Sequence, residues 1–230
     1  MDTPEGLAQF TRGPRTVEEG EIAVTRRTIH LCGQDIDKPG HICAFFSSRE
    51  QEYETLVPYF REGVDADEHI LMVLDAHRLD DHRSRLQRAG IGAYAHLATA
   101  SSEETYLAEG RFDIEKMAGF VEDTLRAAQA EGRRVRTAGW MDWLHRDAPG
   151  TDRVMEYEAR MNTLVPNFDC TFMCVYDIAN LTGAMVVDIM ATHPYVVLNR
   201  NVRQNPFYVP PDVYLKQRIA RSEASESTTS

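Results

Sequence analysis

The sequence predicts an α/β protein, a three-layer sandwich whose central sheet is mostly parallel. Apolar runs of strand length, such as residues 41–46 and 69–74, alternate along the chain with longer segments whose apolar residues recur at helical spacing. Continuous apolar runs are typical of strands buried on both faces of a parallel sheet. The alternation of strand and helix favours right-handed crossover connections, which place helices on both faces of the sheet.

The apolar run Gly40–Phe46 is the segment around which the other elements are organised, and we expect it to be a central strand. Ser48, followed by Gln51, forms a capping box that starts a helix directly behind the strand. Gly63 ends this helix. Upstream, residues 27–32 are expected to form a strand, which the turn around Gly33 would make part of an edge hairpin.

The later elements follow from the same two patterns. One surface helix covers residues 79–89, a long helix stops at Gly132, a third starts at Asp152 and ends at Pro166, and a fourth covers 183–191. The expected later strands are 69–74, 94–98, 135–141, 170–176 and 195–198. The domain plan is an N-terminal arm with a possible edge strand (1–38), a single domain (39–216) and a disordered C-terminal tail (217–230).

Composition excludes several classes of protein. The 230 residues contain 25 Lys and Arg against 36 Asp and Glu, a net charge of −11 that argues against a nucleic-acid-binding surface. No apolar run is long enough for a membrane span and no secretory signal is visible, so we expect a cytoplasmic protein with no membrane partner. The four cysteines have no CxxC pair and are expected to be reduced thiols.

The junction after the central strand lacks the features of a phosphate-binding loop. It reads Phe46-Ser47-Ser48-Arg49 without glycine, and the chain has no Gly-Lys-Ser/Thr, so a Walker A motif is absent. Glu50 and Glu52 in the first helical turn would repel a phosphate. The sequence therefore predicts the fold of a nucleotide-binding domain without its nucleotide loop.

A set of short motifs in consistent order resembles the MEDS family, a sensory domain named for methanogens, methylotrophs and the dichloromethane regulator. The matching residues are His41-Ile42-Cys43 with Phe45-Phe46, Gly139 to Trp143, Tyr157-Glu158 with Asn162, Cys174 to Asp177, Thr192-His193-Pro194, and Asn205-Pro206 with Tyr208. The resemblance covers roughly residues 39–216. It implies a bacterial RecA/KaiC-like core without a P-loop, and a role in signalling instead of catalysis.

The sequence departs from the family pattern at one strand end. Family members usually have Glu where Trp140 stands and Ser where Asp142 stands. A polar contact made from this strand end is therefore expected to be moved or absent here.

The candidate ligand-binding or switch residues fall into two expected clusters. Aromatic and acidic side chains at the carboxyl ends of strands could form a ligand pocket, and two histidines with one glutamate could form a hydrogen-bonded switch. A single composite pocket is the rival arrangement, and ordinary core packing explains the aromatic residues almost as well. The candidates are Trp140, Asp142, Trp143, Tyr157, Tyr176 and Asp177 for the first cluster, and His41, Glu158 and His193 for the second.

The spacing of potential ligands predicts no metal site and no catalytic residue. The chain has no HxxxH, HxH or CxxC pattern, and Cys170 and Cys174 would lie about 13 Å apart on one strand. A nucleophile pair of His41 and Cys43 fails because the two side chains sit several ångströms apart in the core.

The resulting hypothesis is a non-catalytic sensory or signalling domain that binds a small molecule or a partner protein. Its output is expected to be a separate protein, such as a transcription regulator, a histidine kinase or an anti-sigma type of factor, and a homodimer is compatible with the sequence. One alternative is a degenerate KaiC-like nucleotide-binding protein or ATPase, and another is a pure interaction scaffold. The sequence specifies no cofactor and no ligand.

Overall fold

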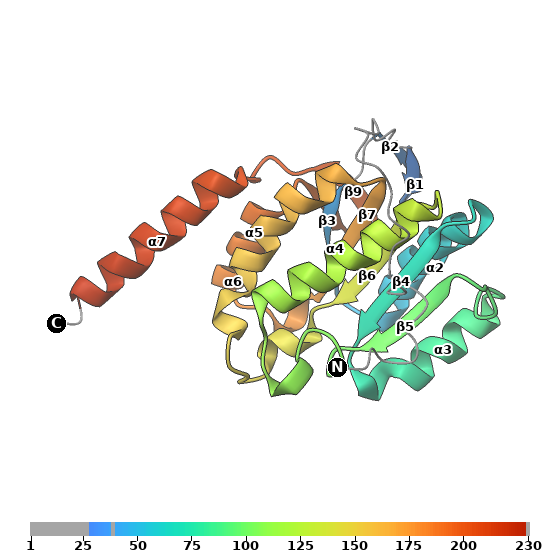
Figure 1. The fold of residues 1–230 in the computed structure, drawn as a ribbon, viewed down its shortest axis with the longest axis horizontal. Helices are drawn as coiled ribbons and strands as arrows, with labels where there is room; N and C mark the ends of the chain where they lie inside the picture. Colours follow the sequence, from blue (N-terminus) through green and yellow to red (C-terminus); the bar gives the residue numbers. More distant parts are fainter. Residues whose placement is uncertain (1–27, 38–39, 229–230) are drawn as a thin grey trace.

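A seven-stranded sheet forms the middle layer of the protein in the computed structural model, which describes residues 28–37 and 40–228. The strand order is β5-β4-β6-β7-β3-β8-β9, and every neighbouring pair is parallel except β8 and β9. Helices cover both faces of this sheet (Figure 1). The predicted α/β fold with a mostly parallel central sheet is confirmed.

The helices and strands have clear bounds. The strands are β1 Ile29–Leu31, β2 Gln34–Ile36, β3 His41–Phe46, β4 His69–Leu74, β5 Leu97–Ser101, β6 Val135–Trp140, β7 Cys170–Asp177, β8 Tyr195–Leu198 and β9 Asn201–Gln204. The helices are α2 Arg49–Asp65, α3 Leu79–Arg88, α4 Ile114–Ala130, α5 Val154–Leu164, α6 Gly183–Thr192 and α7 Pro211–Thr228.

Alternate residues of the central strands serve two separate apolar cores. In β3, Cys43 and Phe45 pack with α4, α5 and α6, whereas Ile42, Ala44 and Phe46 pack with α2, α3 and the β1–β2 hairpin. This follows from the period of two along a strand, which sends successive side chains to opposite faces. Because both faces are covered, all six residues of β3 are buried.

Four elements differ from the sequence-based expectations. The upstream strand pairs with Gln34–Ile36 in a two-stranded sheet apart from the main one, and the third strand lies at 97–101 instead of 94–98. A short 3-10 turn, Thr151–Arg153, precedes α5, so Asp152 is not its cap. The edge strand β9 was not expected. The proposed arm over residues 1–27 lies outside the described residues.

At the C-terminal end, α7 replaces most of the predicted disordered tail. The helix starts at Pro211, a residue that favours the first helical position, and extends to Thr228. Figure 1 shows it running away from the rest of the protein toward the C-terminus. Within residues 28–37 and 40–228, no helix has the length and apolar character that a membrane crossing requires.

The buried imidazole of His82, on α3, connects the helices on this face of the sheet to the strands β4 and β6. Nδ1 of His82 and the Tyr53 hydroxyl are hydrogen-bonded at 2.7 Å, and Nε2 lies 3.2 Å from the sulfur of Met72. Burial, and then the nearby Arg78, lowers the pKa of His82 to about 3. His82 is therefore neutral in the folded protein at neutral pH.

This burial predicts a loss of stability in mild acid. An unfolded histidine takes up a proton below about pH 6.5, whereas folded His82 resists protonation down to about pH 3, so the free energy of unfolding should fall across this window. The contribution of such a group is at most about 1.4 kcal/mol per pH unit. Urea denaturation at pH 7, 6 and 5 gives the free energy of unfolding at each pH. This free energy should fall less steeply with decreasing pH in His82→Gln than in wild type, and as steeply as in wild type in His145→Gln, whose side chain is exposed. The same pH dependence in wild type and His82→Gln would contradict this assignment.

Candidate functional site

Four buried side chains meet around one carboxylate oxygen. Oε2 of Glu158, in the middle of α5, lies 3.0 Å from Nε2 of His41 at the start of β3 and 3.4 Å from Nε2 of His193 after α6. The thiol of Cys174 on β7 lies 3.5 Å from the same oxygen and 3.3 Å from the His41 nitrogen. We call these four residues the Glu158 cluster. All four are buried.

The C-terminus of α6 holds His193 in place. Pro194 disfavours helix at the preceding residue, and α6 ends at Thr192 with an extended His193. A helix end leaves its last carbonyl groups without partners inside the helix. In α6, each of the last four carbonyl oxygens has a donor from outside the helical hydrogen-bond pattern. Two accept from asparagine side chains: Met190 O from Asn205 Nδ2 (2.6 Å) and Thr192 O from Asn162 Nδ2 (2.6 Å). The other two accept from His193 Nδ1 (Ile189 O, 2.8 Å) and from the backbone N–H of Val209 (Ala191 O, 2.9 Å).

The charges of the Glu158 cluster follow from its burial. Burial alone would raise the pKa of Glu158, but the two imidazole rings facing the carboxylate outweigh it and lower the pKa to about 2. Burial, and then His193, lowers the pKa of His41 to about 4. Burial, and then the carboxylate of Glu158, raises the pKa of the Cys174 thiol well above its usual range. The cluster therefore holds an ionised carboxylate with a neutral His41 in the protein interior.

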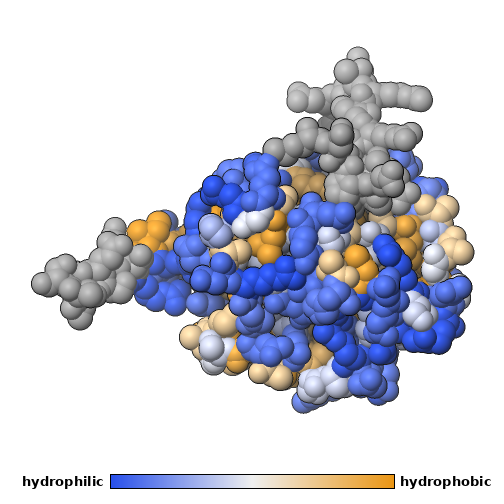
Figure 2. Space-filling model, turned by 90° about the horizontal axis from the view of Figure 1, so that it is seen from below, coloured by the Kyte–Doolittle hydropathy of each residue, from blue (hydrophilic) through white to orange (hydrophobic). Residues whose placement is uncertain are grey.

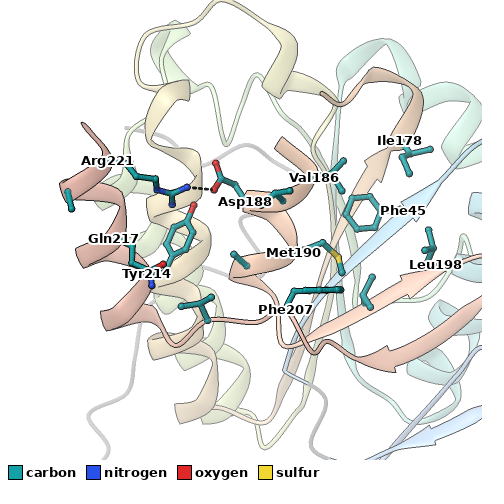
Figure 3. Close-up of a pocket in the computed structure, with 15 residues that line it drawn as sticks. Phe45, Ile178, Val186, Asp188, Met190, Leu198, Phe207, Tyr214, Gln217 and Arg221 are labelled. Carbon is teal, nitrogen blue, oxygen red and sulfur yellow. Dashed lines mark hydrogen bonds and ion pairs between the residues drawn. The ribbon is translucent and has the colours of Figure 1, made fainter. Parts of the chain in front are cut away.

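A separate apolar cavity of about 800 Å³ opens between α6, α7 and the end of the sheet. Figure 3 shows side chains of these elements pointing into it, with the Arg221–Asp188 ion pair (3.4 Å) on the side of α7. Most of the lining is aliphatic or aromatic, and only a few polar side chains reach it. The apolar lining includes Phe45, Ile178, Val186, Val187, Met190, Ala191, Val196, Leu198, Phe207 and Val209, and α7 adds Tyr214, Gln217, Ala220 and Arg221.

Two aromatic rings connect this cavity to the Glu158 cluster. The ring of Phe45, which lines the cavity, stacks on Tyr176 with 5.5 Å between centroids. Tyr176 in turn forms a T-shaped contact with His193, with 6.1 Å between the ring centroids, and the ring centroids of His41 and His193 are 4.0 Å apart. The cavity and the cluster thus share the strand β3 and the junction between α6 and β8.

The carboxyl ends of β4 and β6 carry an ion-pair network. Arg78 contacts Glu52 at 2.6 Å and Asp142 at 2.7 Å, and the indole nitrogen of Trp140 donates to the same Glu52 oxygen at 2.7 Å. Arg49 contacts both carboxylates from the solvent side. Burial alone would lower the pKa of Arg78, but Glu52 and Asp142 outweigh it and raise the pKa. The guanidinium groups of Arg49 and Arg78 are thereby matched by carboxylates.

The structure brings together the three predicted switch residues, His41, Glu158 and His193. It divides the predicted aromatic and acidic cluster between the two faces of the sheet. Trp140 packs in the core on the α2 side of the sheet, whereas Trp143 packs on the other side between Tyr106 and Phe112. Tyr157 also lies in that second core, against Phe112. Asp177 accepts a hydrogen bond from the backbone N–H of Ala179 and so ends its strand.

None of the nine candidate residues lines the apolar cavity. The sequence led us to expect a ligand near Trp140, Trp143 and Asp177, and this expectation stays a prediction. The apolar cavity lies beside α6 and α7. One feature of the sequence could have indicated the cavity: α6 is apolar on nearly all sides. Such a helix is normally buried all round, yet Val187 is 66% exposed.

Residues 40–194 match the family model described as MEthanogen/methylotroph, DcmR Sensory domain. This match spans well over half of the chain, and several of the matched motif residues are those that build the Glu158 cluster. The chain belongs to the MEDS family. It is thus a member of a family of sensory domains. A direct comparison of the sequence with curated proteins gives no match.

Among solved structures, the MEDS chain is similar to one titled EssC (ATPases 2 and 3) from Geobacillus thermodenitrificans. The sequence identity is 11% and the TM-score is 0.43, with 80% of this chain and 39% of that chain covered. This chain therefore spans about two fifths of that chain's length. A likeness at this level says nothing about function.

The strand-end network gives a matched pair of variants. Arg78→Met should destabilise the protein by about 3 to 5 kcal/mol, because it leaves the buried carboxylate of Glu52 without its main partner. Arg49 contacts the same two carboxylates but is 37% exposed, so Arg49→Met should cost about 1 kcal/mol or less. Chemical denaturation at pH 7 measures both. Equal losses for the two variants would show that Arg78 does not hold this edge together.

Proposed function

We propose that this MEDS domain is a non-catalytic sensor that binds an uncharged, largely apolar small molecule in the cavity between α6, α7 and the sheet. The single observation that carries the proposal is the cavity itself. Its volume of about 800 Å³ is within the range of small-molecule sites. Its lining offers few polar groups, which favours an apolar ligand with at most a small polar part.

The neighbouring elements suggest how occupancy would be transmitted. Val186, Met190 and Ala191 of α6 line the cavity, and the same helix ends at His193. A ligand that shifts α6 would therefore change the distance between His193 and Glu158. Because packed interiors are bistable instead of continuously deformable, such a shift is a suitable switch.

Helix α7 is the natural output of this domain. It contributes Tyr214, Gln217 and Arg221 to the cavity and then runs away from the rest of the protein (Figures 1 and 3). Its outer surface includes Ile219, which is 61% exposed, and Figure 2 shows a hydrophobic patch on α7 beside the grey end of the chain. We infer that a separate signalling protein, of the transcription-regulator, histidine-kinase or anti-sigma type, contacts this helix.

A neutral, solvatochromic dye tests the cavity. Nile red should bind the wild-type protein saturably. Val187→Glu should weaken binding by at least about tenfold, because a dye seated against this part of the lining would remove water from the new carboxylate. The matched control is Val213→Glu, which alters another exposed valine outside the cavity lining. Fluorescence titration gives the affinities, and circular dichroism confirms that both variants are folded.

Two results would contradict the sensor proposal. One is the absence of saturable dye binding by the wild type, and the other is an equal loss of binding in Val187→Glu and Val213→Glu.

A second candidate function is an interaction scaffold whose groove takes a segment of a partner protein. It is favoured by the exposed rim of the cavity, where Phe207 is 67% and Leu198 is 46% exposed. Native mass spectrometry separates the two functions. A co-purified small molecule that is retained by wild type and lost from Val187→Glu supports the sensor, whereas a bound peptide mass supports the scaffold.

Mg-ATP, added as a control, should give no adduct, since the arginines at the strand ends are already paired.

A further inference from the structure

The Glu158 cluster offers four potential metal ligands from four different parts of the fold. His41 supplies Nε2 from β3, Glu158 a carboxylate oxygen from α5, Cys174 a thiol from β7, and His193 Nε2 from the junction of α6 and β8. These atoms all lie within 4.8 Å of one another. The geometry points to a binding site for one transition-metal ion, and the donor set of one thiol, two imidazoles and one carboxylate suits Zn²⁺ best.

Four of the six distances between the ligand atoms are close to those of a tetrahedral site, and the other two are at most 4.8 Å. Metal–ligand bonds of about 2.0 to 2.3 Å that meet at tetrahedral angles place neighbouring ligand atoms about 3.3 to 3.6 Å apart. In the cluster, Oε2 of Glu158 lies 3.0, 3.4 and 3.5 Å from the ligand atoms of His41, His193 and Cys174, and the His41 nitrogen lies 3.3 Å from the thiol. Small side-chain adjustments would therefore be enough to admit an ion.

The hydrogen bonds of His193 favour a cation at this position. Nδ1 of His193 faces the carbonyl oxygen of Ile189 at 2.8 Å and donates its proton there. A neutral ring then directs the lone pair of Nε2 toward the carboxylate of Glu158, which also carries lone pairs. Nε2 of His193 and Oε1 of Glu158 are without a hydrogen bond among the described residues. Metal-binding histidines typically donate their second ring N–H to a backbone carbonyl or a carboxylate, as His193 does here.

The charge of the Glu158 cluster also favours a bound cation. Within residues 28–37 and 40–228, no Lys or Arg forms an ion pair with Glu158. A buried carboxylate without a cationic partner is costly. A divalent ion bound by one carboxylate, one thiolate and two neutral imidazoles makes the group neutral overall.

The metal site was not expected from the sequence because its ligands lie on four separate elements. A second group, His69, His96 and Glu131, also has ligand atoms within 4.8 Å, but it has three members, and Glu131 is exposed. It serves as the control for adventitious binding.

Cobalt substitution tests the proposal on the full chain without a histidine tag. The protein is treated with a chelator, dialysed and titrated with Co²⁺. A tetrahedral site with a thiolate gives strong visible bands and a thiolate-to-cobalt charge-transfer band that saturates at about one ion per chain. Zn²⁺ should displace the cobalt and abolish both. Absence of these bands in wild type would overturn the proposal.

Matched variants assign the ligands. Cys174→Ser should remove the charge-transfer band and weaken Zn²⁺ binding by at least about 100-fold. Cys43→Ser should keep both, because the Cys43 thiol faces the Tyr195 carbonyl at 3.6 Å instead of the cluster. His96→Gln should also leave the bands unchanged. A folded Cys174→Ser protein that binds cobalt like wild type would overturn the assignment.

A further readout does not depend on whether the variants fold. Adding Zn²⁺ to the chelator-treated wild type should raise its melting temperature with saturation, since an ion that binds only the folded state stabilises it. An unchanged melting temperature would contradict the site. The apolar cavity is tested separately by the dye, so failure of one proposal leaves the other intact.

Discussion

The contact on which this structure most depends is the one between the carboxylate of Glu158 and the two imidazole rings of His41 and His193. It joins α5 to the first residue of β3 and to the junction between α6 and β8, and Cys174 adds β7. Because the carboxylate is fully buried, its position is highly constrained: a displaced partner would leave a charge in the apolar interior, at a cost of several kcal/mol.

Several of the motifs that the sequence analysis singled out act on this contact. Asn162 and Asn205 satisfy carbonyls at the end of α6, and Pro194 ends that helix at the residue where His193 must turn inward. These residues are far apart in the sequence and serve one purpose, the placement of α6. The same helix lines the apolar cavity. A sensory domain that reads occupancy of the cavity therefore has a mechanical path to its buried charge.

The sequence predicted the strands that are apolar throughout, such as β4 and β7, and the helices with one clear apolar face, such as α4, because burial alone specifies them. It did not predict β9, whose residues are mostly exposed and whose pairing with β8 is a long-range property. His41, His193 and Glu158 were expected to be neighbours and are in contact, but the fourth member, Cys174, was considered only together with Cys170. The cavity was not predicted because its walls come from α6, α7 and several strands. A segment as apolar as α6 gives no sign that one side of the helix is exposed.

We propose that the apolar cavity and the Glu158 cluster respond to each other. The most direct measurement is the NMR signal of the ring nitrogens of His41 and His193 during a titration with Nile red. These rings do not line the cavity, so a shift can reach them only through α6, β3 or Tyr176. We expect both signals to shift and to saturate at the same dye concentration as the fluorescence. Saturated dye fluorescence with unchanged histidine signals would contradict it.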